Sequence, residues 1–447
     1  MKSEQSKEDP KNSLVEYIGY SNGGQCGYCQ RDETKHSSIA VWSFSISVSH
    51  YNGLLDRGMR RCGKYIYKPV IKNTCCPQYT IRLDANKFRL TRSQKRALRH
   101  MNDFLLKDIR PRVQLNKFAS SVESKAINSN DRFTKTVVEN SDQTRKKSGR
   151  KKKDFRRQRA FKKMLEKGID IEEAQRKRKE KEESRRRTVH SFFIDYDPET
   201  FKHKLIVRLI SVDSPEYIET FTESYALFEK YQKIVHNDTS CTKSSYRSFL
   251  ADSPLFSDEK CENNCLPLGT YHQQYYIDEH LIAVGVLDIL PRCLSAKYFY
   301  YDPDYEFLSL GTYSALREIA FTQELSKDRP QLRYYYMGFY IHSCRKMRYK
   351  GHFHPSDLLC DRSFTWVPLE KCLEMIEKFG ERVEAFNPDA PVAETCSVES
   401  IRCLYQSKIM SYQHLLGFPG FKETEKFMEE YAQLVGPMAQ EMLLHRN

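Results

Sequence analysis

Four cysteines in the first eighty residues have the type and spacing of ligands for one metal centre. Cys26 and Cys29 form a C-x-x-C turn in QCGYCQ, and Cys75 and Cys76 stand side by side in NTCCPQYT. Two thiolates in a tight turn can bind one ion, and four satisfy zinc or an iron–sulfur cluster. One such turn plus an adjacent pair is a weaker signal than two turns. Buried apolar cysteines and a redox pair of vicinal thiols therefore stay open as alternatives.

Length and composition fit an intracellular protein of two or three domains. The chain has 447 residues, 14 cysteines and a formal net charge of +14. No run of eighteen apolar residues occurs and residues 1–10 are polar, so we expect neither a membrane span nor a secretory signal. Inside a cell, cysteines are expected as thiols or metal ligands rather than as disulfides.

Nearly all of the net charge lies in residues 145–187, which hold 21 lysines and arginines against 8 aspartates and glutamates. Such a segment cannot bury enough surface to fold alone, so residues 121–188 are predicted to be a basic linker, mostly disordered or helical. The linker is a solvated spacer, a nuclear-localisation signal or an RNA-backbone contact. It separates a predicted N-terminal domain, residues 1–120 with the cysteine site, from a C-terminal domain, residues 189–447.

The C-terminal part shows an ordered series of elements. Residues 281–291 form a short apolar run bounded by proline, which predicts a buried strand, and residues 296–305 read as a second strand. An amphipathic helix is predicted to begin around Ser309 and Gly311, and residues 333–344 read as another strand. This order is found in acyltransferases of the GNAT class, so we expect an α+β fold with a GNAT-like acyltransferase C-terminal domain. A strand is also predicted over residues 38–49, and helices over residues 91–107 and 215–235.

Two charged groups in these elements could do chemistry. Asp288 is the single acid in the apolar run, where an ionised carboxylate is costly without a partner, so it either caps a turn or belongs to a working site. Arg60 and Arg61 lie among tyrosines in DRGMRRCGKYIYKP and suit an anion such as phosphate or a carboxylate. Basic residues that protect a strand edge from aggregation explain the same pattern equally well.

Taken together, several stretches resemble the eukaryotic arginyl-tRNA–protein transferase family. The similarity covers residues 17–106 and 189–410. It is carried by QCGYCQ, RRCGKYIYKP, TCCPQYTIR, GTYHQQYYID, LIAVGVLDILPRC, YFYYDPDYEFLSLGTYSALREIAF, YYYMGFYIHSCRKMRYKG and PSDLLCD. Two positions depart from the family pattern: Cys62 stands where serine is common, and Met59 where an aromatic residue is usual. These departures leave a metal role for Cys62 and a stacking role at position 59 open.

The resemblance implies transfer of arginine from arginyl-tRNA, the co-substrate, to the α-amino group of proteins that begin with Asp, Glu or oxidised Cys. Such transfer marks proteins for ubiquitin-dependent degradation in the N-degron pathway. It also implies that the four cysteines jointly hold a metal or an iron–sulfur cluster in the N-terminal domain. The expected partners are arginyl-tRNA and proteins with acidic or oxidised-Cys N termini, without a membrane. The cytoplasm is the expected location, with the nucleus as a second compartment to consider.

Aminolysis of an aminoacyl ester needs a free amine, a place for the oxyanion and a proton for the departing ribose hydroxyl. Asp288, Asp302 and Asp304 could orient or deprotonate the amine, or bind the arginyl side chain, and the sequence does not separate these roles. The expected catalytic residues are Asp288, Asp302, Asp304, His272 and Tyr276.

Selection of an acidic first residue needs a cation, for which Arg60 and Arg61 are expected and Arg317 is a rival. The end of the tRNA is expected at the helix start around Gly311, where free backbone N–H groups favour phosphate. A basic patch for the acceptor stem is expected further along, although a solvated loop would also explain it. The patch consists of Lys346, Arg348 and Lys350.

Two other functions fit parts of the sequence. An acyl-CoA-dependent GNAT acetyltransferase would use the same kind of helix start, but the Q/R-x-x-G-x-G/A loop is absent before TYSALREIAF, so coenzyme A is not expected. A non-catalytic zinc- or RNA-binding adaptor would explain the thiols and the linker. It would explain neither the acid in the apolar run nor the order of strands and helix.

Overall fold

The computed structural model describes residues 12–24, 26–29, 35–110, 187–258 and 265–446, together with three isolated positions between residues 110 and 187. The described residues before position 112 and after position 188 form one compact unit. The predicted basic linker lies almost entirely outside the described residues. Among the described helices, none is both long and apolar enough to cross a membrane.

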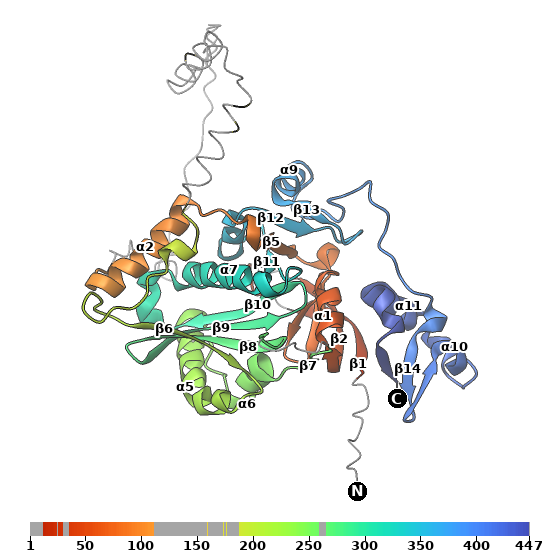
Figure 1. Cartoon of the computed structure of the whole chain (residues 1–447). Helices are drawn as coiled ribbons and strands as arrows, with labels where there is room; N and C mark the ends of the chain where they lie inside the picture. The colour runs from red at the N-terminus through yellow and green to blue at the C-terminus, as the bar shows by residue number, and fades with distance from the viewer. Residues whose placement is uncertain are drawn as a thin grey trace, which may run out of the picture. The chain divides into compact units, whose positions relative to one another are not determined.

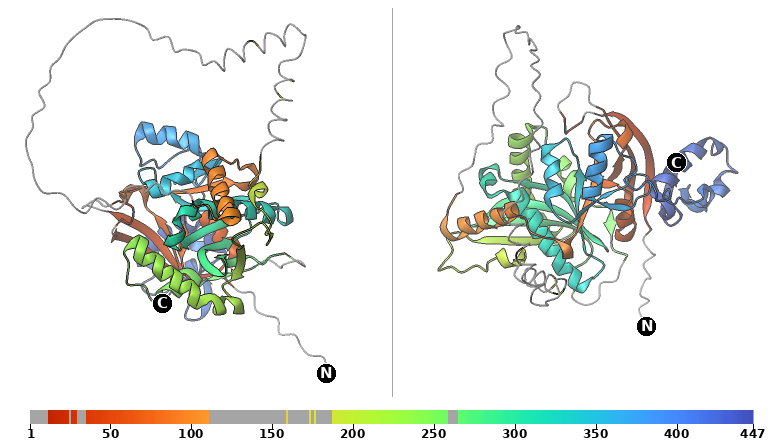
Figure 2. Two further views of the ribbon diagram at one scale, coloured as in Figure 1. Left: turned by 90° about the vertical axis from the view of Figure 1, so that its left-hand side faces the viewer. Right: turned by 90° about the horizontal axis from the view of Figure 1, so that it is seen from above.

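The first sheet has the strand order β15-β14-β16-β1-β2-β4-β3, and β7 pairs with β2. Its strands are β1 (Leu14–Gly24), β2 (His36–Ser47), β3 (Arg60–Cys62), β4 (Tyr65–Pro69), β7 (Leu255–Phe256), β14 (Arg402–Tyr405), β15 (Lys408–Ser411) and β16 (Leu443–Arg446). The strand predicted over residues 38–49 is confirmed by β2, in which Val41 is buried while its neighbour Trp42 is partly exposed. The C-terminal segment with α11 packs beside β1 (Figures 1 and 2).

The second sheet has the order β13-β12-β5-β11-β10-β9-β8-β6. Its strands are β5 (Tyr79–Asp84), β6 (Leu205–Ser211), β8 (Gly269–Ile277), β9 (His280–Ile289), β10 (Cys293–Tyr301), β11 (Tyr334–Tyr340), β12 (Ser356–Leu359) and β13 (Trp366–Pro368). Because β5 lies between β11 and β12, and β14 to β16 extend the sheet of β1, both sheets combine early and late parts of the chain. The division into an N-terminal and a C-terminal domain stays a prediction.

Helices cover both faces of the second sheet: α7 lies on one face, and α5 and α6 lie on the other (Figure 1). The helices are α1 (Val48–Leu55), α2 (Arg92–Lys107), α5 (Pro215–Tyr231), α6 (Lys243–Tyr246), α7 (Leu310–Asp328), α8 (Arg345–Arg348), α9 (Leu369–Phe379), α10 (Tyr412–Leu415) and α11 (Glu425–Val435). The helix predicted over residues 91–107 is confirmed by α2, which begins with a capping box between Thr91 and Gln94. The helix predicted over residues 215–235 is confirmed by α5, which continues as η4 (Gln232–His236).

The predicted series of strand, strand, helix and strand is confirmed by β9, β10, α7 and β11. Mixed sheets packed with helices confirm the α+β class, and the likeness to GNAT acyltransferases stays a prediction. Buried apolar side chains on α7, such as Leu316 and Ile319, pack into the same core as Leu287 of β9. This core fixes α7 against the strands that carry the candidate site.

β10 and β11 are parallel but pair only at their first residues, from Cys293 with Tyr334 to Ser295 with Tyr336. Beyond that point, β10 has an irregularity between Ala296 and Tyr298 in its pairing with β9, and β11 has one between Tyr336 and Phe339 in its pairing with β5. The remaining residues of the two strands do not pair with each other. We call this place, residues 296–301 and 337–340, the strand opening.

Candidate functional site

The four predicted metal ligands come together at one end of the first sheet. The Sγ atoms of Cys26, Cys29, Cys75 and Cys76 all lie within 4.8 Å of one another. Cys26 and Cys29 follow the end of β1, and the backbone N–H of Cys75 donates to the carbonyl of Lys35 just before β2 at 2.9 Å. The hairpin and the turn after β4 therefore bring two pairs of thiols, 46 residues apart, to one place.

The turn that carries the vicinal pair is fixed by the side chain of Thr74, which is fully buried. Its hydroxyl donates to the carbonyl of Val70 at 2.8 Å, closing the turn over η1 (Ile71–Asn73). Burial raises the pKa of the Cys75 thiol, but a backbone hydrogen bond with Lys35 and bonds with the neighbouring thiols outweigh it and bring the pKa to about 7. A thiol that ionises near neutral pH is ready to bind a metal ion.

The donor set fits a metal. Zinc held by four thiolates at about 2.3 Å places the sulfurs roughly 3.8 Å apart. The four sulfur atoms here all lie within 4.8 Å of one another, so small shifts would bring them to that distance. The Sγ atoms of Cys29 and Cys75 are already 3.4 Å apart. Cys62 is not a member of this group, although it is a free thiol. The cluster can therefore bind a metal ion, and the four predicted ligands are the residues that would hold it.

The metal ligands pack against the segment that follows β11. Ile341 is fully buried against Cys26 and Cys76, and Cys344 and Met347 complete the contact. Cys344 caps the start of α8, a single turn that carries the exposed side chains Arg345, Lys346 and Arg348. The cysteine cluster therefore supports the turn that displays two residues of the predicted tRNA patch.

Asp288 and Arg61 are brought together, and each is the partner of the other. The Nη2 of Arg61 donates to Oδ1 of Asp288 at 2.6 Å and its Nε donates to Oδ2 at 2.8 Å, with neither side chain exposed. Thr270 of β8 donates its hydroxyl to the same Oδ1 at 2.9 Å. Arg61 also donates to the carbonyl of Gly63 at 3.0 Å. This pair ties β3 to β8 and β9, and the predicted roles of its two members at the amine and at the substrate stay predictions.

Arg60, next in the strand, points to the opposite face and has no acidic partner. One of its amino groups, Nη1, donates to the carbonyl of Met59 at 2.9 Å, while Nε and Nη2 are buried without a partner in the described part of the chain. The guanidinium lies over the rings of Tyr336 and Phe339, with centroids at 5.4 and 5.7 Å. Burial lowers its pKa. A buried cation with free N–H groups is costly unless an anion or water meets it.

Lys350 lies beside Arg60 at the strand opening. Its Nζ donates to the backbone carbonyl of Phe339 at 3.0 Å. Burial, and next the nearby Arg60, lower the pKa of Lys350 to about 7. Lys350 is predicted from sequence as part of the tRNA patch, and this role stays a prediction. In the structure Lys350 lies near Arg60 and is less exposed than Lys346 and Arg348.

Lys297 belongs to the part of β10 that does not pair with β11, and sequence reasoning missed it. Its Nζ donates to the carbonyl of Phe249 at 2.7 Å. Burial, and next the guanidinium of Arg61, lower the pKa of Lys297 to about 7. A lysine in the aromatic run AKYFYY is the signal that could have found it, in the same way that an acid in an apolar run drew attention to Asp288.

Glu318 of α7 is a second buried group that sequence reasoning missed. Burial raises the pKa of its carboxyl group to about 7, and the hydroxyl of Tyr335 donates to it at 2.6 Å. Its position beside Gly285 leaves no room for a larger residue on β9, because an added Cβ would lie 3.3 Å from the carboxylate. The charged residues around it on the helix surface gave no sign that this one faces inward.

The other predicted catalytic residues have hydrogen-bond partners outside this group, although Lys297 lies close enough to His272 to add to the effect of burial on its pKa. Asp302 and Asp304 both accept a hydrogen bond from Lys230 at 2.7 Å. Asp302 is also the N-cap of η6 (Pro303–Leu308), where its side chain accepts from the backbone N–H of Asp304. His272 is fully buried, and burial lowers its pKa to about 4, so the imidazole is neutral. Tyr276 donates to Glu223 at 3.1 Å.

Arg317 and Gly311 lie on α7. The guanidinium of Arg317 sits 4.0 Å from the centroid of the Phe193 ring and donates to the hydroxyl of Tyr313 at 3.1 Å. Gly311, in the first turn, has open space around the position of a Cβ. The roles predicted for these two residues, and for the acids, His272 and Tyr276, stay predictions.

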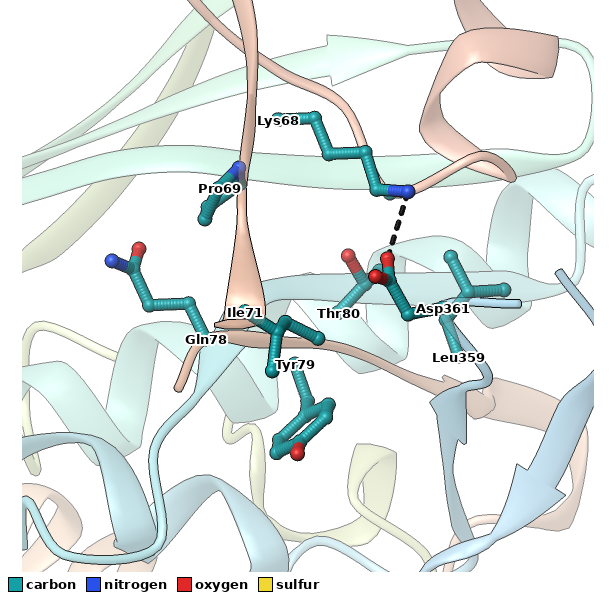
Figure 3. A pocket seen from close by; sticks show the side chains of 9 residues that line it. Lys68, Pro69, Ile71, Gln78, Tyr79, Thr80, Leu359 and Asp361 are labelled. Atoms are coloured by element: carbon teal, nitrogen blue, oxygen red, sulfur yellow. Dashed lines mark ion pairs between the residues drawn. The ribbon is translucent and has the colours of Figure 1, made fainter. Parts of the chain in front are cut away.

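Figure 3 shows a small pocket between β4 and the segment after β12, crossed by an ion pair of 2.7 Å between Lys68 and Asp361. Its volume is about 10 Å³. A cavity of that size holds about one water molecule, so it is not a substrate site.

Comparisons with known proteins bear on both parts of the site. Two family models match: Arginine-tRNA-protein transferase, N terminus, over residues 24–96, and Arginine-tRNA-protein transferase, C terminus, over residues 223–360. Arginyl-tRNA–protein transferase 1 of Drosophila melanogaster is 34% identical over 494 residues, which cover 97% of this chain and 99% of the relative. The chain belongs to the arginyl-tRNA–protein transferase family. Arginyl-tRNA–protein transferase 2 of Arabidopsis thaliana is 31% identical, over 80% of this chain and 75% of its own.

Both matched regions of the arginyl-tRNA–protein transferase family contain residues of the candidate site. The N-terminal region contains the four cysteines and Arg60, and the C-terminal region contains Lys297, Glu318 and Lys350. A more distant relative, the aspartate/glutamate leucyltransferase of Pseudomonas syringae pv. syringae, is 32% identical over 38% of this chain and 66% of its own.

Proposed function

We propose that the chain transfers arginine from arginyl-tRNA to the α-amino group of proteins that begin with Asp, Glu or oxidised Cys. Membership of the arginyl-tRNA–protein transferase family supports the reaction. The name of the Pseudomonas relative, aspartate/glutamate leucyltransferase, supports the class of acceptor. Arginylated proteins would then enter the N-degron pathway for ubiquitin-dependent degradation.

One observation carries the choice of an acidic acceptor: Arg60 is buried with two N–H-bearing nitrogens unpartnered among the described residues. Lys350 stands beside it, and no acid in the described part of the chain forms an ion pair with Arg60. A carboxylate or sulfonate on the first residue of a protein would supply the missing charge and accept these hydrogen bonds. Arg61 is less suited to this role because Asp288 already takes two of its bonds.

The chemistry needs modest help. The nitrogen of the α-amine attacks the ester carbonyl carbon, the bond from that carbon to the ribose oxygen breaks, and one proton moves from the nitrogen to the departing oxygen. An α-amine has a pKa of about 7.7–8.0, so a base with a similar pKa suffices. Lys297, with a pKa of about 7, is neutral in part at neutral pH and can take this proton and return it to the ribose oxygen.

The metal centre has a supporting part in this proposal. Zinc or an iron–sulfur cluster on the four thiolates would tie the β1–β2 hairpin to the turn before β5 and supply a rigid base for Ile341 and α8. The cytoplasm, where thiols stay reduced, is the proposed compartment, and the nucleus remains a second one.

The full chain is tested with labelled arginyl-tRNA and three peptides that differ only in the first residue: Asp, Asn or Gly. We expect label on the Asp peptide and little on the other two, because Asn has the shape of Asp without its charge. Equal labelling of Asp and Asn would remove Arg60 from acceptor selection. No labelling of any peptide, with tRNA shown to be charged, would reject the transferase.

A further inference from the structure

A cavity of about 420 Å³ lies on the α5 face of the second sheet, at the β10 edge. Its size falls within the range of about 300–1,000 Å³ that is usual for small-molecule sites. It is lined by Phe228, Gln232, His236, Asp238, Ser240, Cys241, Ser245, Phe249 and Tyr298. None of these residues takes part in the transfer chemistry described above, so the cavity has no assigned purpose.

The inner wall of the cavity is aromatic. The ring of Tyr298 meets Phe249 edge-on with centroids 5.0 Å apart and Phe228 with centroids 6.2 Å apart. Gln232 donates its Nε2 to the Tyr298 hydroxyl at 2.9 Å, which holds the ring in place. The outer rim consists of exposed neutral or weakly basic groups, among them Ser240 and His236. The cavity thus offers flat apolar surfaces inside and hydrogen-bonding groups at its mouth.

The cavity lies between the strand opening and the basic turn of α8. Tyr298 follows Lys297 directly on β10, and Phe249 in the wall supplies the carbonyl that accepts from Lys297. On the other side, Lys346 of α8 is close enough to act on His236, whose pKa is lowered by burial and next by that ammonium group. A ligand in this cavity could therefore reach the candidate base at one end and a phosphate-binding cation at the other.

A cationic ligand fits this cavity poorly. Asp238 is the single acid in its lining. Its Oδ1 already accepts the N–H of Ser240 at 2.9 Å and the hydroxyl of Ser240 at 2.6 Å, and its Oδ2 accepts from Cys241 at 3.7 Å. The transferred arginyl side chain would lack a free carboxylate here. A neutral, flat ring with donors and acceptors on its edge matches the lining.

We propose that this cavity binds the adenine at the 3′ end of arginyl-tRNA, stacked on the wall formed by Phe228, Phe249 and Tyr298. This assignment rests on the proposed transferase function and adds a binding site to it. The base in the cavity would place its ribose ester toward Lys297, and the preceding phosphates would run toward Lys346 and Arg348. Stacking is tolerant of sequence, which suits an end that every tRNA shares.

The test measures binding of uncharged tRNA to the full chain, with the tRNA either intact or lacking only its terminal adenosine. Wild-type protein is expected to bind the shortened tRNA about tenfold more weakly, as the loss of one stacked base predicts. Tyr298→Ala is expected to bind intact tRNA as weakly as wild type binds the shortened one, and to lose the difference between them. Ser240→Trp, which fills the cavity from its exposed rim and leaves the core untouched, is expected to behave in the same way.

Phe379→Ala, on the exposed end of α9, is the matched control and should bind both tRNAs as wild type does. Equal binding of the two tRNAs by wild type, or a full difference retained by both cavity variants, would overturn the assignment. The assignment would also be overturned by cavity variants that keep the difference in binding between intact and shortened tRNA but no longer prefer arginyl-tRNA to another aminoacyl-tRNA. In that case the cavity would hold the amino acid. Arginine transfer to the Asp peptide is measured separately. If wild type transfers arginine but binds the intact and the shortened tRNA equally, the cavity site alone is rejected. If wild type transfers no arginine, the proposed function is rejected.

Discussion

The guanidinium of Arg61 and the carboxylate of Asp288 form a two-bond ion pair with no exposed side-chain surface, across 227 residues of sequence. The pair joins the first sheet, through β3, to the second sheet, through β9. Thr270 completes it by accepting from Arg61 at 2.8 Å and donating to Asp288 at 2.9 Å. Such a pair fixes the position of β3, which carries Arg60, relative to β9. β9 in turn pairs with β10, the strand that carries Lys297.

Asp288→Asn is expected to destabilise the protein by about 3–5 kcal/mol, because it leaves the Arg61 cation buried without a counter-charge. The double variant Arg61→Met with Asp288→Asn removes that charge and should recover part of the loss. Urea unfolding of the three proteins measures both effects. A single variant that unfolds like wild type but no longer transfers arginine would contradict this structural role and make Asp288 the base.

Local patterns in the sequence were sufficient to predict β2, β9, α2 and α7, because alternation, an apolar run and helical spacing all act within a few residues. The cysteine cluster could be predicted as well, since ligand type and spacing are local and the fold only had to bring two pairs together. The partnership of Arg61 with Asp288 could not be predicted, because nothing near either residue specifies the other.

Burial set the rest of the site, and burial depends on the whole fold. Arg60 and Arg61 are adjacent in sequence and alternate in direction along β3, so one is paired and the other is not. Lys350 looks like its exposed neighbours Lys346 and Arg348 in sequence. In the fold its Nζ donates to the carbonyl of Phe339 on β11, which no local pattern specifies. Lys297 likewise becomes a candidate base only because the fold buries it near Arg61, which lowers its pKa.

Arg60→Met is expected to lower the preference for an Asp peptide over an Asn peptide by about 2 kcal/mol, roughly thirtyfold, since it removes charged hydrogen bonds to the acceptor. The ratio of kcat/KM for the two peptides measures this preference. Arg96→Met, on the exposed face of α2, is the control and should keep the wild-type ratio. An unchanged ratio in Arg60→Met would assign acceptor selection to another cation.

Lys297→Met is expected to lower transfer to the Asp peptide about 10²-fold or more, because the base is lost. Stability supplies an independent check. The pKa of Lys297 is about 7 in the folded protein and about 10.4 when unfolded, so between these values the unfolded chain binds more protons and stability rises with pH. Wild type should therefore gain stability relative to Lys297→Met from pH 7 to pH 10, measured by urea unfolding. Lys346→Met, which removes an exposed lysine, should show no such trend, and a flat difference for Lys297→Met would refute the buried amine.

Cys75→Ser is expected to lose bound metal, and Cys62→Ser is expected to keep it, because only the former belongs to the cluster. Elemental analysis of protein purified without oxygen measures this directly. Loss of the metal should lower Tm by about 5 °C or more and increase hydrogen exchange in residues 341–350, which pack on the ligands. Metal loss from Cys62→Ser, or unchanged exchange in that segment after chelation, would contradict the arrangement.

Glu318→Gln is expected to stabilise the protein above neutral pH while leaving it unchanged in acid. Burial raises the pKa of Glu318 to about 7, above its unfolded value of about 4.3, so the folded chain binds more protons between these values. The stability that the neutral carboxyl group contributes is therefore complete below pH 4 and is lost as pH rises to 7. Glutamine keeps an acceptor for the Tyr335 hydroxyl and carries no charge at any pH. Urea unfolding at pH 4 and pH 8 should show equal stability at the lower pH and a more stable variant at the higher one, and equal stability at both would mean that folding does not raise the pKa of Glu318.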